Sequence, residues 1–112
     1  MNIATQEIIK KVITICPEGR LDSFAAPQLR AKLVALVEAG HNQIVLDLRH
    51  IEFMDSAGIA VLVNTLKRTR QTGGDTKLVT PHDESTMRMF RLTQFDKIFT
   101  MVETPEEAIA LF

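Results

Sequence analysis

The sequence predicts an α/β fold, a single domain with a mixed, mostly parallel β-sheet of four to five strands and about four α-helices. Short runs of β-branched residues alternate along the chain with longer segments whose apolar residues recur at helical spacing. In addition, 43–48 contains an uninterrupted apolar run, which is typical of a central parallel strand covered on both faces. Strands that alternate with helices are joined by right-handed crossovers, so helices are expected over the sheet.

Composition and charge narrow the class of protein. The 112 residues, 46% hydrophobic and 24% charged, suit one compact domain across 1–112 that needs no disulfide or structural metal. A net charge of −1 is too small to attract nucleic acid or a membrane surface. The amino terminus has no basic start or apolar signal region, and no apolar run approaches the ~20 residues of a membrane span. We therefore expect a cytoplasmic protein without direct nucleic-acid contact or membrane insertion.

The first elements follow from β-branched runs and helix-end residues. Runs 3–8 and 12–16 predict a β-hairpin, and the Pro-Glu-Gly that follows ends its second strand. Cys16 is the only cysteine and lies in the second run, so we expect a buried, inert thiol. Residues 26–39 have the spacing of an amphipathic helix, with proline in the first turn and glycine just past the end.

The rest of the chain repeats the alternation of helix and strand. After a connector at 49–55, a helix begins near Ser56 and stops before a Gly-Gly pair. An apolar cluster near the carboxyl end is expected to cover the sheet, although part of it would widen a partner surface if exposed; its members are Met87, Met89, Phe90 and Phe95. The further predicted elements are a strand at 76–80, a helix at 84–92, a strand at 98–102 and a helix at 105–111 capped by Thr104.

The segment 53–59 carries the chemistry. It lies where a strand hands over to a helix, so Ser56 is expected in the helix cap or first turn with an exposed hydroxyl. Free backbone N–H groups and the positive end of the helix dipole favour a phosphate there, and Gly58 leaves room for close backbone approach. The simpler interpretation is that Asp55 and Ser56 are ordinary caps worth about 1 kcal/mol.

Three linked motifs resemble the STAS-domain family, in particular the bacterial anti-sigma factor antagonists. Residues 19–22, Gly-Arg-Leu-Asp, resemble the family's Gly-x-Leu-Asp turn. Residues 44–48 resemble its central strand, and 55–59, Asp-Ser-Ala-Gly-Ile, resemble its Asp-Ser-Ser/Thr-Gly-Leu signature. The order and spacing agree over nearly the whole chain, which makes a short signature informative.

The resemblance implies partner switching. In such a pathway the unphosphorylated protein binds an anti-sigma factor that is also a serine kinase of histidine-kinase-like ATPase fold, and the sigma factor is released. Phosphorylation of the serine that maps onto Ser56 abolishes binding, and a PP2C-type phosphatase reverses it. Asp22 and Asp55 map onto family aspartates beside that serine. The resemblance thus implies a partner surface of Asp22, Asp55, Ser56, Ala57, Gly58 and Ile59. Ala57 departs from the common second hydroxyl, which leaves no such group to orient the kinase.

Other functions have less support in the sequence. No convergent set of acid, base and nucleophile predicts an enzyme, so no catalytic residue and no cofactor are assigned. His41, His50 and His82 lack metal-ligand spacing, which argues against a metal site. Two alternatives stay open from the family resemblance: a STAS regulatory subunit of a membrane transporter, and a scaffold of a larger signalling complex.

Overall fold

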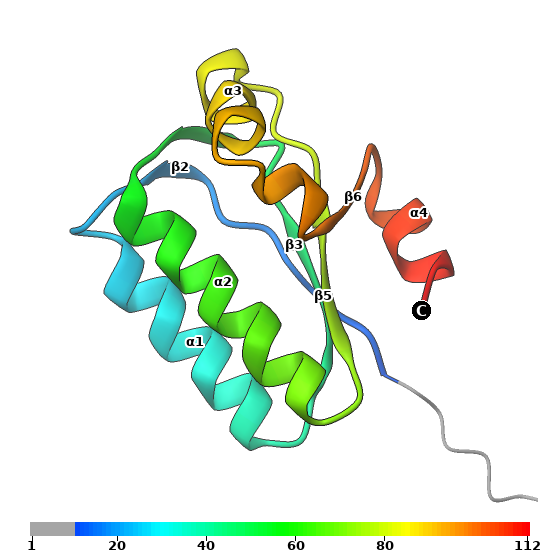
Figure 1. Cartoon of the computed structure of the whole chain (residues 1–112). Helices are drawn as coiled ribbons and strands as arrows, with labels where there is room; N and C mark the ends of the chain where they lie inside the picture. Colours follow the sequence, from blue (N-terminus) through cyan, green and yellow to red (C-terminus); the bar gives the residue numbers. More distant parts are fainter. Residues whose placement is uncertain (1–10) are drawn as a thin grey trace, which may run out of the picture.

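The structure is a computed structural model that describes residues 11–112 (Figure 1). Its main sheet confirms the predicted fold class. Each neighbouring pair of strands in it is parallel, and β3 is buried along its whole length, as its uninterrupted apolar run predicts. The sheet has the strand order β1-β3-β5-β6, formed by β1 (Ile13–Ile15), β3 (Gln43–Asp47), β5 (Asp75–Val79) and β6 (Thr100–Val102).

A second, two-stranded ladder was not predicted. Strand β2 (Gly19–Leu21) pairs in parallel with β4 (Ile51–Met54), inside the segments expected to be a turn and a connector. The prediction of a plain connector at 49–55 is therefore wrong. Strands of three and four residues are too short to show a period-2 pattern. In β4, moreover, only the two end residues are buried. The last paired residues are Leu21 and Met54, so Asp22 and Asp55 leave the ladder at the same level.

Four α-helices lie within residues 11–112, and they occupy the predicted segments. In Figure 1, α1 and α2 lie side by side over one face of the main sheet, and α4 lies on the other side. The larger core lies beneath α1 and α2, and a smaller cluster of Val45, Val79 and Ala108 lies beneath α4. Thr104 caps α4 by accepting a hydrogen bond from the Glu107 amide, as predicted. The bounds are α1 (Ala26–Glu38), α2 (Ser56–Gln71), α3 (Glu84–Leu92) and α4 (Pro105–Ala110), with a 3₁₀ turn at Phe95–Lys97.

Three details differ from, or lie beyond, the expectations for the ends of the chain. The strand expected at 3–8, and with it the hairpin, lies outside the described residues. Cys16 is exposed rather than buried, because β1 already ends at Ile15. Partial burial and the nearby Asp47 carboxylate raise the pKa of the Cys16 thiol, which keeps it protonated and weakly reactive. The last strand begins at Thr100 rather than at 98, because the amides of Ile98 and Phe99 still bond to the Phe95 carbonyl of the preceding 3₁₀ turn.

The apolar cluster near the carboxyl end mostly covers the core, as expected. Phe90 is fully buried and meets Phe99 edge to face, with ring centroids 6.5 Å apart. Met89 and Phe95 are half-buried against the same core. No helix within residues 11–112 combines the length and the apolar character needed to span a bilayer.

An ion pair closes the carboxyl end of the central strand. Arg49 donates from Nε and Nη2 to the carboxylate of buried Asp47, and the Nη2 to Oδ2 distance is 2.8 Å. Burial raises the pKa of Asp47, but the hydrogen bonds and charge of Arg49 outweigh that effect and hold the pKa below its ordinary value. The Arg49 guanidinium is thus the main partner of this buried carboxylate, together with the Arg49 amide at 3.1 Å.

Arg49→Ala is expected to destabilise the protein, lowering Tm by more than about 5 °C at neutral pH, because it leaves a buried carboxylate unpaired. In the wild type, the contribution of Asp47 is present above its unfolded pKa of ~3.9 and is lost as the pH falls through the lowered folded pKa. In the variant only the amide of residue 49 and the charge of His50 still oppose burial, so less of this stability is present at neutral pH and less is lost in acid. The Tm difference between the two proteins should therefore shrink as the pH falls towards 4. A pH-independent difference in thermal melts would contradict this account.

Candidate functional site

The carboxylate of Asp55 organises the start of α2. It is the N-cap residue, and its Oδ1 accepts hydrogen bonds from the amides of Ala57 at 2.9 Å and Gly58 at 3.3 Å. Its Oδ2 accepts a third bond, 3.1 Å long, from the amide of Ser23 in the loop between β2 and α1. One side chain thus joins two segments that are 32 residues apart in sequence.

Asp22 orders the same loop from within. Its Oδ1 accepts hydrogen bonds from the amides of Phe24 and Ala25, at 3.1 and 3.0 Å. The Ala25 amide, the Phe24 amide and the charge of Arg20 together hold the pKa of Asp22 below its usual range, against a smaller opposing effect of burial. Asp22 therefore presents carboxylate charge beside the helix start at neutral pH.

Ser56 is the first residue of α2 and is exposed, as the sequence predicts. The environment of its hydroxyl differs from the expectation in one respect. The amides of Ala57 and Gly58, which were expected to receive a phosphate, already bond to Asp55. A phosphate on Ser56 would therefore compete with a carboxylate rather than fill an empty amide cradle.

Gly58 allows close approach, but to the protein itself. A Cβ added at this position would lie 2.7 Å from the carbonyl oxygen of Leu21 and 2.8 Å from Cγ of Met54. The close backbone approach that Gly58 was expected to allow is made by β2, with the Met54 side chain of β4 beside it. Ile59 is buried as well, at 7% exposure, and Ala57 is half-buried. Gly58 and Ile59 are thus buried beneath the site and pack it against the core. The residues that reach its surface are Asp22, Asp55, Ser56 and Ala57.

Two aromatic residues beside the site were not predicted. Phe24 is 94% exposed, and Phe53 is 36% exposed with the guanidinium of Arg20 only 4.1 Å from its ring centroid. Each lies in a segment too short to show a periodic pattern, so the sequence does not mark it as a surface residue. A groove of about 730 Å³ runs between α1 and α2 from Ser23 and Ala57 towards Arg68. Within residues 11–112, no three His, Cys, Asp or Glu side chains converge as metal ligands would.

Comparison with known proteins identifies the family of this chain. The model of the STAS domain matches residues 4–108. The anti-sigma-B factor antagonist of Bacillus subtilis is 34% identical over 81% of this chain and 82% of its own. The crystal structure of a Thermotoga maritima protein assigned as an anti-sigma factor antagonist has a TM-score of 0.84 and 30% identity, and covers 93% of this chain and 89% of that one. The structure of the antagonist SpoIIAA in its unphosphorylated form has a TM-score of 0.71 and 26% identity, over 94% and 91%.

The chain therefore belongs to the STAS-domain family. Within it, the chain is of the bacterial anti-sigma factor antagonist type, as the motifs around Asp22 and Ser56 predict.

Asp55→Ala is expected to lower the free energy of unfolding by about 1 to 2 kcal/mol, because it removes the N-cap of α2. It should also free the Ser23 amide. Urea unfolding measures the first effect, and amide hydrogen exchange at Ser23, Ala57 and Gly58 measures the second. Asp55→Asn serves as the control, since its side-chain oxygen still accepts hydrogen bonds and should retain most of the stability. Unchanged exchange at Ser23 in the alanine variant would refute the bridging role.

Gly58→Ala is expected to destabilise the protein by roughly 1 to 3 kcal/mol, because the new methyl group meets the backbone of β2. The matched control is Ser56→Ala, two residues earlier on the exposed side of the same turn, where an added or removed group meets little. Chemical denaturation of both variants checks this expectation. Equal stability of Gly58→Ala and the wild type would show that α2 can move away from β2 without loss.

Proposed function

We propose that this chain is an anti-sigma factor antagonist that acts by partner switching and not by catalysis. Its unphosphorylated form binds an anti-sigma factor, which is also a serine kinase of histidine-kinase-like ATPase fold, and the sigma factor is released. Phosphorylation of Ser56 abolishes this binding, and a PP2C-type phosphatase restores it, all in the cytoplasm. The observation that carries the proposal is the exposed Ser56 at the first position of α2, flanked by the carboxylates of Asp55 and Asp22.

The charges around Ser56 explain why a phosphate would act as a switch. A phosphoserine adds about −1.5 to −2 charge at pH 7 and considerable bulk. Here that charge would enter next to Asp55, whose carboxylate already uses the amides of Ala57 and Gly58. A partner surface that fits the two carboxylates would then meet excess negative charge and a steric block. A penalty of about 3 to 4 kcal/mol corresponds to a loss of affinity of several hundredfold.

The local structure also supports a switch that leaves the fold intact. Ser56 is exposed, and the capping of α2 rests on Asp55 rather than on the serine. SpoIIAA, which is similar to this chain, has a structure in its unphosphorylated form. This supports phosphorylation as the change that switches binding here. Modification of Ser56 would thus alter the surface of the site and not its core.

Pulldown from the host lysate with and without ATP tests the proposal, with mass spectrometry of bait and partners. We expect recovery of an anti-sigma factor kinase by the wild type, with release as Ser56 gains phosphate. Ser56→Ala should bind constitutively and resist phosphorylation, and Ser56→Asp should bind at least about tenfold more weakly. Ser85→Asp is the matched control, because Ser85 is an exposed serine beside the capping aspartate of a different helix, α3.

The competing outcomes are distinct. Loss of partner binding in folded Ser56→Ala would refute the role of the unmodified serine. Recovery of a membrane transporter or of a stable high-mass complex, with Ser56 unmodified, would favour a transporter subunit or a scaffold instead.

A further inference from the structure

Phe24 is unusual in how completely it is presented to solvent. Its side chain is 94% exposed, more than any other large hydrophobic side chain in residues 11–112; Leu92 follows at 77%. It lies between Asp22 and α1, in the loop that Asp55 holds to the start of α2. An exposed phenylalanine contributes little packing to the isolated domain, so burial of its ring against another molecule would be favourable.

The loop that carries Phe24 is held rigidly by hydrogen bonds. Four successive amides in it have acceptors: Ser23 bonds to Asp55, Phe24 and Ala25 bond to the Asp22 side chain, and Ala26 bonds to the Asp22 carbonyl at 2.8 Å. The backbone is therefore already ordered before any partner arrives. Pre-organisation of this kind lowers the entropic cost of binding, which is typical of an interface anchor.

We propose that Phe24 is the principal apolar anchor for the anti-sigma factor and inserts into an apolar pocket on that partner. This inference rests on the proposed function and adds a residue and a partner chemistry to it. The rim of the pocket carries a cation or N–H donors, because the carboxylate of Asp22, with a side chain 30% exposed, lies in the same loop and that of Asp55 is bonded to it. These carboxylates also disfavour an anionic membrane as the occupant.

The same hydrogen bonds connect the anchor to the switch. Asp55 Oδ1 holds the first turn of the helix that begins at Ser56, while Asp55 Oδ2 holds the loop of Phe24. A phosphate that displaces or repels the Asp55 carboxylate would thus act on both parts of the surface together. Phosphorylation would then weaken binding through the seat of the anchor as well as through direct repulsion.

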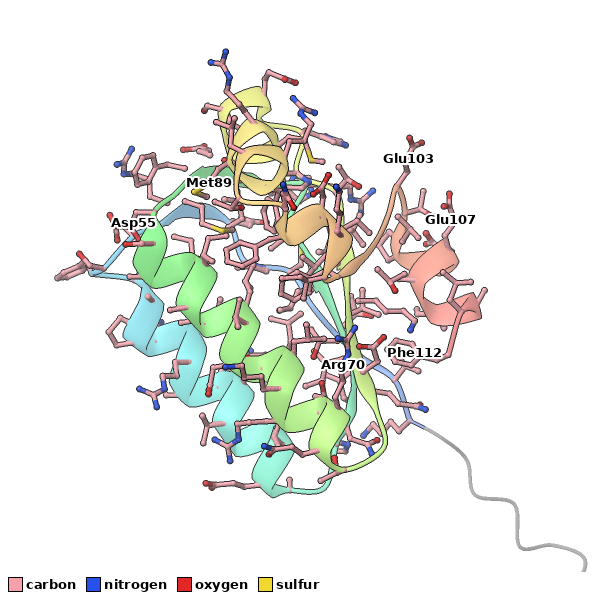
Figure 2. The ribbon with its side chains drawn as sticks, in the orientation of Figure 1. Asp55, Arg70, Met89, Glu103, Glu107 and Phe112 are labelled. Carbon is pink, nitrogen blue, oxygen red and sulfur yellow. The ribbon has the colours of Figure 1, made fainter. Side chains whose placement is uncertain are left out.

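The inference is tested by measuring affinity for the anti-sigma factor that the wild type recovers in the pulldown, once that partner has been purified. We expect Phe24→Ala to weaken binding at least about 30-fold, as truncation of an interface anchor does. Tm should stay at the wild-type value, because the side chain makes little contact within the domain. Leu111→Ala is the matched control, because Leu111 is 57% exposed and directly follows α4. Figure 2 shows α4, with Glu107 labelled, on the far side of the sheet from Asp55. The Leu111→Ala variant should bind like the wild type.

Each outcome separates the two proposals. Wild-type affinity in Phe24→Ala, with Ser56→Asp still impaired, would overturn the anchor and leave the proposed function standing. Failure of the wild type to bind any anti-sigma factor would overturn both. A wild-type dimer that becomes a monomer on Phe24→Ala, with partner affinity unchanged, would show instead that a second copy of this chain covers Phe24; mass measurement in solution detects that case.

Discussion

The architecture of the site depends on one carboxylate, that of Asp55. It accepts hydrogen bonds from two amides at the start of α2 and from one amide in the loop before α1, so it fixes these segments relative to each other. The helix is held close enough to β2 that only glycine fits at position 58. Capping and close packing act in the same place: the cap sets where the helix begins, and the missing Cβ sets how near it lies.

The small β2–β4 ladder explains why Asp55 and Asp22 are neighbours at all. Parallel pairing ends at Leu21 and Met54, so the next residue on each strand emerges at the same edge. The Asp55 amide then bonds to the Leu21 carbonyl at 3.3 Å, which extends the pairing by one residue. Parallel strands bring their carboxyl ends together, and that edge is where α/β folds place their binding sites. The site is thus a consequence of topology, and its residues supply only the last few contacts.

Much of this fold could be predicted because its apolar residues recur with a regular period or because turn residues mark the ends of its elements. The helices show apolar spacing with proline or glycine at their ends, and β3 shows an unbroken apolar run. The β2–β4 ladder could not be predicted, since three or four residues do not establish a period. The exposure of Cys16 depends on where β1 ends, and the role of Gly58 depends on a strand that pairs from elsewhere in the chain. Both are tertiary facts that local sequence does not encode.

The candidate site divides in the same way. Ser56 and its cap lie within one short motif, so their positions follow from the helix signal alone. Phe24 gives no such signal, because an apolar residue in a loop is common on protein surfaces. It becomes informative only with its exposure and the hydrogen bonds that order its backbone. Asp55 and Asp22 both hold the site through hydrogen bonds and reach its surface, whereas Ser56 and Phe24 are exposed and neither caps a helix nor packs in the core. The proposed switch at Ser56 thus uses a residue that the cap of α2 does not need.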